Sequence, residues 1–124
     1  MAFKTAGSDV AMPTDMVAPS ALAIDLNHLH RQTMGDRHLQ QQVLKLFIRH
    51  ADDQIERLRM AGSIEARREA AHSLVGSSKG IGAFAMAAIA AEIESAKGPV
   101  DGRLKALTGA AAAARAFIEA FLAA

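Results

Sequence analysis

The chain has no cysteine, tryptophan or tyrosine, and only five of its 124 residues are aromatic. The absence of cysteine excludes disulfide bonds and thiolate metal sites, and it is compatible with a reducing compartment. Too few aromatic rings are present to stack on single-stranded nucleic acid. The formal net charge of +1 provides no field that would attract a phosphate backbone. We therefore expect no nucleic-acid binding.

Long apolar runs are also scarce at the start of the chain. Asp9, Pro13 and Asp15 interrupt any run that could serve as a signal peptide. We expect no segment that approaches the roughly 20 apolar residues of a membrane span, and hence a cytoplasmic protein without membrane contact. Residues 1–20 mix Gly, Ser, Pro, Thr and Asp without periodicity. They are predicted to form a flexible tail ahead of a single domain over residues 21–124.

What the sequence does contain is alanine, leucine, isoleucine and methionine in helical patterns, with few β-branched residues. Asp25, Asp36 and Ser63 are suited to cap the starts of helices. The predicted helices cover residues 25–32, 37–60, 64–81, 83–97 and 100–123. Helix 37–60 has a predicted core stripe of Leu39, Val43, Leu44, Phe47, Ala51, Ile55 and Leu58. Short connections make neighbouring helices antiparallel, so we predict an all-α, up-down four-helix bundle with a short extra N-terminal helix.

One histidine in helix 64–81 shares a face with a glycine and a lysine. At about 100° per residue, Gly76 and Lys79 both lie within about 40° of His72, whereas Leu74 and Ile81 lie on the opposite side. His72 should therefore be exposed. Gly76 weakens the helix by about 1 kcal/mol relative to alanine, which indicates that a partner approaches the backbone there; close helix packing is the alternative. Lys79 could reach an anion held on the imidazole, and a phosphoryl group is the anion we expect.

The same region carries a family resemblance over residues 71–83, which read AHSLVGSSKGIGA. This stretch is similar to the signature of histidine phosphotransfer (HPt) domains, which runs roughly A-H-x-L-K-G-[SA]-[SA]-x-x-[ILV]-G-A. The matching positions are His72, Leu74, Gly76, Ser77, Ser78, Ile81, Gly82 and Ala83. The sequence departs from the pattern at Val75, where family members usually carry lysine. Lys79 lies nearer to the direction of His72, and other family members place a basic residue there.

The resemblance implies a phosphocarrier that works through a phosphohistidine. His72 would accept a phosphoryl group from the aspartate of a receiver domain, in a response regulator or a hybrid histidine kinase, and pass it to another receiver in a two-component phosphorelay. The receiver would supply the aspartate, Mg²⁺ and most catalytic groups, so we expect this chain to bind no cofactor. No ATP-binding signature is present, and no autonomous kinase activity is expected. The other four histidines show no metal-ligand spacing.

The docking surface implied by the resemblance lies around the histidine. It includes Val75 and Gly76, together with Arg68 one turn before the histidine. Leu29 or Ile24 of the short first helix could extend this surface. We expect the chain to act as a monomer.

The predicted hairpin of helices 64–81 and 83–97 suggests one further contact. If the turn lies near Gly82, residues about ten positions after it are level with His72, and Glu92 and Glu94 are found there. Either carboxylate could accept a hydrogen bond from imidazole Nδ1–H and leave the lone pair of Nε2 facing outward. The alternative is that both are ordinary solvated carboxylates.

Two alternatives stay open at the level of the whole function. His72 could be a plain surface histidine, and Lys79 a plain solvated charge. The missing lysine at position 75 also permits an HPt-like binding module, which docks and sequesters a receiver or another signalling protein without carrying phosphate.

Overall fold

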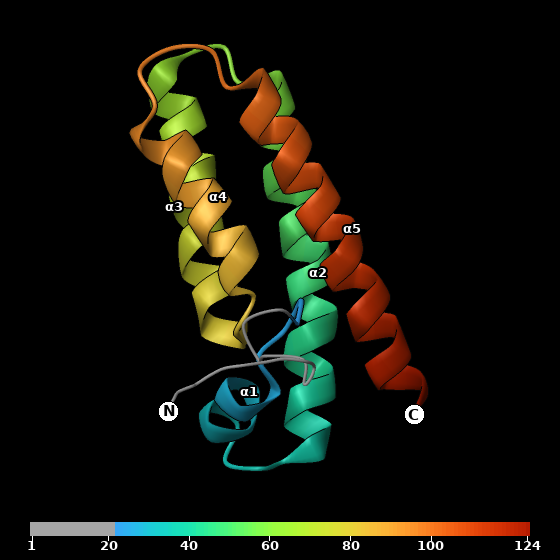
Figure 1. Ribbon diagram of the computed structural model, residues 1–124. Helices are drawn as coiled ribbons and strands as arrows, with labels where there is room; N and C mark the ends of the chain where they lie inside the picture. Colours follow the sequence, from blue (N-terminus) through green and yellow to red (C-terminus); the bar gives the residue numbers. More distant parts are fainter. Residues whose placement is uncertain (1–21) are drawn as a thin grey trace, which may run out of the picture.

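The computed structural model describes residues 22–124 of the chain, and these residues form five helices (Figure 1). The helices are α1 (Leu26–Gln32), α2 (Arg37–Met60), α3 (Ile64–Ile81), α4 (Phe84–Ser95) and α5 (Asp101–Ala123). The predicted flexible tail over residues 1–20 lies outside the described residues, so it stays a prediction.

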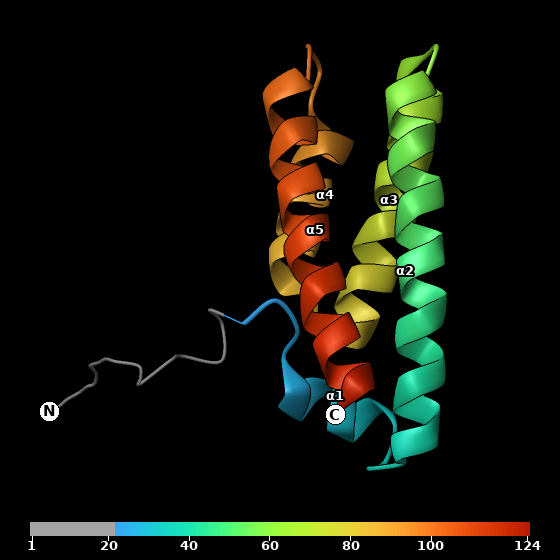
Figure 2. The same ribbon diagram turned by 90° about the vertical axis from the view of Figure 1, so that its right-hand side faces the viewer.

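The four longer helices run alternately up and down and form the bundle (Figures 1 and 2). Helix α3 packs against α2 and α4, and α5 closes the ring by packing against α4 and α2. The short α1 lies at the end of the bundle where α3 finishes, and it contacts α3. The predicted all-α bundle with an extra N-terminal helix is confirmed.

Three helices begin at the side-chain caps that the sequence indicates. Asp25 accepts a hydrogen bond from the backbone N–H of His28, and Asp36 accepts one from Leu39, each at 3.1 Å. Ser63 Oγ likewise accepts from the N–H of Ala66 at 3.1 Å. These bonds satisfy backbone donors that have no partner within the first helical turn.

Helix α4 ends at Ser95, two residues earlier than predicted, because an arginine binds the carbonyl groups that follow it. Arg67 of α3 donates from Nη2 to the carbonyl of Ala96 at 2.8 Å and from Nη1 to that of Gly98 at 3.1 Å. Ala96 itself is extended, with φ −69° and ψ 143°. Arg67 therefore fixes the end of α4 against α3, and it does so from a position in the first turn of α3.

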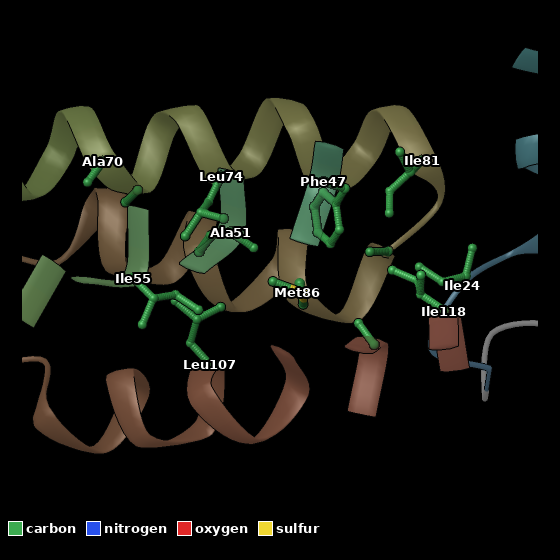
Figure 3. Packing of buried hydrophobic residues seen from close by; sticks show 14 of the residues in the cluster. Ile24, Phe47, Ala51, Ile55, Ala70, Leu74, Ile81, Met86, Leu107 and Ile118 are labelled. Carbon is green, nitrogen blue, oxygen red and sulfur yellow. The ribbon is translucent and has the colours of Figure 1, made fainter. Parts of the chain in front are cut away.

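The core lies along the axis of the bundle and draws on every helix (Figure 3). Its largest fully buried apolar side chains are Ile24, Leu29, Leu44, Leu74, Met86, Ile93, Leu107 and Ile118. Burial of a side chain of this size stabilises the fold by about 1.5–3 kcal/mol. Leu74 of α3 faces this core, so the opposite side of α3 faces outward.

The N-terminal part of α2 departs from the predicted core stripe. Leu39 is 36% exposed, and Gln40 is buried in its place. Gln40 donates from Nε2 to Thr33 Oγ1 at 3.1 Å, and that hydroxyl donates to the carbonyl of Leu29 at 2.7 Å. The reason is local: the connection between α1 and α2 presents the hydroxyl of Thr33 to this position, and a glutamine can bind it whereas a leucine cannot.

Helix α5 also corrects the prediction that no segment approaches a membrane span. By length and composition, residues Asp101–Ala123 are apolar enough to cross a membrane, because alanines dominate the helix. In the bundle, Leu107 and Ile118 of α5 are fully buried among the other helices. Some of the apolar residues of α5 therefore belong to the core of the bundle. One helix of this length and composition is weak evidence of a membrane span.

Candidate functional site

The fold presents His72 on the outer side of α3. Ala71 and Leu74 have no exposed surface, and their burial fixes the rotation of the helix. At the end of the helix, Gly82 adopts a left-handed conformation with φ +87°, and its carbonyl accepts a hydrogen bond from the N–H of Asp25 at 2.9 Å. The side chain of His72 is 77% exposed as a result. This agrees with the exposure predicted from the helical pattern.

The imidazole of His72 is oriented by a carboxylate on the neighbouring helix. His72 Nδ1 lies 2.8 Å from Glu94 Oε2 of α4. An ionised carboxylate can only accept a hydrogen bond, so the proton of the neutral ring lies on Nδ1. The lone pair is then on Nε2, which is the nitrogen that can act as a nucleophile toward a group arriving from solvent.

The second carboxylate predicted to face His72 has a different partner. Glu92 Oε1 lies 3.5 Å from Arg103 Nε, at the start of α5. Of the two predicted candidates, the structure brings only Glu94 to the imidazole. The two residues are two positions apart on α4 and therefore point in different directions.

Gly76 lies one turn after His72 on the same exposed side of α3. A Cβ atom built on Gly76 would meet no atom within 4 Å, and the same is true of Gly80 one turn further along. Close packing among residues 22–124 therefore does not explain the glycine at position 76. Its helix cost of about 1 kcal/mol relative to alanine is accounted for if a partner outside this chain comes close to the backbone.

The remaining predicted site residues surround this surface. Lys79 and Arg68 are exposed on α3, whereas Val75 is half-buried and packs against the core. Position 75 therefore presents an apolar group beside the imidazole where a lysine would present a charge. Within residues 22–124, the side-chain partner of the His72 ring is Glu94 and not Lys79, so the role of Lys79 stays a prediction.

Toward α2 the surface contains a groove that sequence reasoning missed. It has a volume of about 440 Å³ and is lined by Val43, Leu46, Phe47, His50, Ser77 and Ile81. Leu46 is 56% exposed. Ser73, the residue after His72, makes a hydrogen bond of 3.1 Å with His50 Nε2 at the edge of this groove. The sequence signal was Leu46, a leucine that lies outside the core stripe of α2.

Two residues that were expected to extend the docking surface cannot do so. Ile24 and Leu29 are 0% and 1% exposed. Both pack into the core at the end of the bundle, because α1 closes that end with its apolar side turned inward. The prediction that they form part of a docking surface is wrong.

The comparison with known protein families identifies the class of protein. The family model described as "Hpt domain" matches residues 42–124, which is more than half of the chain, and the chain belongs to this family. The family's role is histidine phosphotransfer in phosphorelays, and its members interact with receiver domains. Neither the curated proteins nor the solved structures contain a match to this chain.

Within residues 22–124 there is no group of three or more His, Cys, Asp or Glu side chains that could hold a metal ion.

Proposed function

We propose that this protein accepts a phosphoryl group on His72 Nε2 from the aspartate of one receiver domain and donates it to the aspartate of another. The observation that carries the proposal is the 2.8 Å contact between His72 Nδ1 and Glu94 on an exposed face of an Hpt-family bundle. This contact leaves a nucleophilic nitrogen exposed to an incoming partner. The receivers belong to response regulators or hybrid histidine kinases of a two-component system.

In the accepting step, the lone pair of His72 Nε2 attacks phosphorus while the bond from phosphorus to the aspartate oxygen breaks. The electron pair of that bond leaves with the aspartate, and Nδ1 keeps its proton against Glu94. The donating step is the reverse, with a second aspartate as the attacking group. This chain supplies the histidine and its orientation, and the receiver supplies the aspartate and the Mg²⁺ that neutralises charge during transfer.

The docking surface in this proposal is the exposed side of α3 together with the groove toward α2. Gly76 lets a receiver approach the helix backbone, and Val75 of α3 and Leu46 of the groove add apolar contact area. Arg68 adds a positive charge toward the acidic groups that hold Mg²⁺ in a receiver. Lys79 neutralises part of the phosphoryl charge, because it lies two turns after His72 and long side chains in a helix point back toward its N-terminus.

The direct test is transfer of radioactive phosphate from a phosphorylated receiver to the purified protein in the presence of Mg²⁺. Wild type should gain a label that is lost in acid and survives base, and the His72→Ala variant should gain none. Transfer should need no nucleotide, since the proposal includes no kinase activity of this chain. The proposal also includes a monomeric state and a cytoplasmic location, which sedimentation and fractionation would check.

A second candidate function is favoured by Val75. Without a lysine at that position, the bundle could dock a receiver and sequester it without taking up phosphate. In that case a receiver would bind wild type and His72→Ala with equal affinity, and no label would appear on either protein. If wild type gains label and His72→Ala gains none, the result contradicts the sequestering function.

A further inference from the structure

Glu94 acts on the imidazole through its charge as well as through its hydrogen bond. Its carboxylate lies 2.8 Å from His72 Nδ1, and its side chain is 35% exposed, against 77% for His72. A hydrogen bond to an ionised group is about twice as strong as one between neutral groups. Glu94 therefore does more than select the Nδ1–H tautomer of the neutral ring. It can also stabilise a ring that carries a positive charge.

A positive ring arises once Nε2 carries a phosphoryl group and Nδ1 keeps its proton. Donation breaks the P–Nε2 bond, returns its electron pair to Nε2 and forms a bond from phosphorus to an oxygen of the acceptor. With a proton on Nδ1, the leaving group is neutral imidazole. Without that proton, the leaving group is imidazolate, which is a far stronger base and a poorer leaving group. The step with Nδ1–H in place neither takes up nor releases a proton.

We propose that Glu94 is a positioning residue that holds the proton on Nδ1 of phosphorylated His72 and so makes this chain a fast phosphoryl donor. The inference rests on the proposed function and adds to it a role for Glu94 in the phosphorylated state. Among residues 22–124, Glu94 is the charged side chain that binds the ring of His72.

The charged group in contact with the ring is negative. Position 75 holds an apolar valine, so no charged side chain there holds the phosphoryl group in place. Arg68 lies one turn before His72 and Lys79 about two turns after it, and the contact that the ring makes is with the Glu94 carboxylate. A negative charge against Nδ1 favours the protonated, labile form of phosphohistidine. The site is built to release its phosphoryl group readily.

The test uses a matched pair of carboxylates on α4. Glu94→Gln keeps a hydrogen-bond acceptor but removes the charge, whereas Glu92→Gln changes a carboxylate that pairs with Arg103 and not with the histidine. Each protein is phosphorylated with phosphoramidate, a small chemical donor that requires no receiver. Loss of the phosphohistidine signal is then followed by ³¹P NMR at neutral pH, and nitrogen NMR of the ring reports the protonation of Nδ1.

We expect Glu94→Gln to lose its phosphoryl group about tenfold more slowly than wild type, as for an interaction that is weaker by about 1.4 kcal/mol. The nitrogen spectrum of the phosphorylated variant should show less Nδ1–H. Glu92→Gln should match wild type in both measurements, and Glu94→Asp, which retains the charge, should recover most of the rate.

An equal rate of phosphoryl loss in Glu94→Gln and wild type, with unchanged ring spectra, would overturn the role of Glu94. An equal slowing in Glu92→Gln would overturn it too, since the effect would then be a general one of charge on α4. In both cases transfer from a receiver to His72 could still occur, so the proposed function would stand. A different result would contradict the proposed function: phosphoramidate phosphorylates wild type, but no phosphorylated receiver does.

Discussion

The two sides of α3 have opposite characters, although they are built from the same eighteen residues. The inner side holds Leu74 and Ser78 at 0% exposure, in contact with the core. The outer side holds His72 and Gly76. A Cβ on this glycine would meet no atom of residues 22–124 within 4 Å. Stability is therefore concentrated on one side of the helix and the proposed chemistry on the other. Substitutions on the two sides should have separable effects.

The largest effect on stability is expected on the inner side, from Leu74→Ala. The change removes a fully buried side chain from the centre of the core and leaves a cavity, so the free energy of unfolding should fall by about 2–5 kcal/mol. Urea denaturation followed by circular dichroism measures this loss. The His72→Ala substitution lies on the outer side of α3, two positions away along the helix. It should change the unfolding free energy by less than about 0.5 kcal/mol. Equal losses in the two variants would contradict the comparison.

The next effect concerns the glycine at the end of α3. Gly82 has φ +87°, and a Cβ on it would lie 2.9 Å from the carbonyl oxygen of Asp25. Gly82→Ala should therefore lower the unfolding free energy by about 1–3 kcal/mol, because the backbone is strained and the segment leading into α1 must shift. Thermal or urea unfolding checks the value. A neutral result would mean that α1 is not held against the end of α3.

Gly76→Ala should have the opposite sign. The added methyl group meets no atom, and alanine is the better helix former, so the unfolding free energy should rise by about 0.5–1 kcal/mol. Receiver binding should become weaker, because the methyl group stands where the partner approaches. Gly109→Ala on α5, where a Cβ also meets nothing, is the matched control. It should gain similar stability and leave binding unchanged.

The smallest effect is expected for Lys79→Ala. An exposed charge interaction contributes about 0.2–1 kcal/mol, so transfer to His72 should slow by about 1.4- to fivefold with stability unchanged. Raising the salt concentration should reduce the difference between this variant and wild type. A loss of transfer as complete as that of His72→Ala would assign Lys79 a larger role than its exposed position supports.

Much of the fold could be predicted because the signals are local. Asp25, Asp36 and Ser63 mark helix starts by capping chemistry, and the bounds of α2 and α3 follow from them and from the apolar stripe. The end of α4 could not be predicted. It depends on Arg67, which lies 29 residues earlier in the sequence than the carbonyl of Ala96 that it binds.

The sequence predicts which face of α3 carries the site, but it does not predict which residue of α4 contacts His72. The exposure of His72 follows from the pattern of α3 alone. The choice between Glu92 and Glu94 requires the register of α3 against α4, which tertiary packing sets. For the same reason, the contact of His50 with Ser73 gave no sequence signal. The burial of Ile24 and Leu29 depends on how α1 covers the end of the bundle.

The most direct test of the account compares two histidines that both bind a side chain on a neighbouring helix. His72 binds Glu94, and His50 binds Ser73 at the edge of the groove. Wild type, His72→Ala and His50→Ala are incubated with a labelled phosphorylated receiver, and the acid-labile label is mapped by peptide analysis in alkaline solution. The account predicts label on the peptide that contains His72 in wild type and in His50→Ala, and no label in His72→Ala. Label that persists in His72→Ala would contradict it.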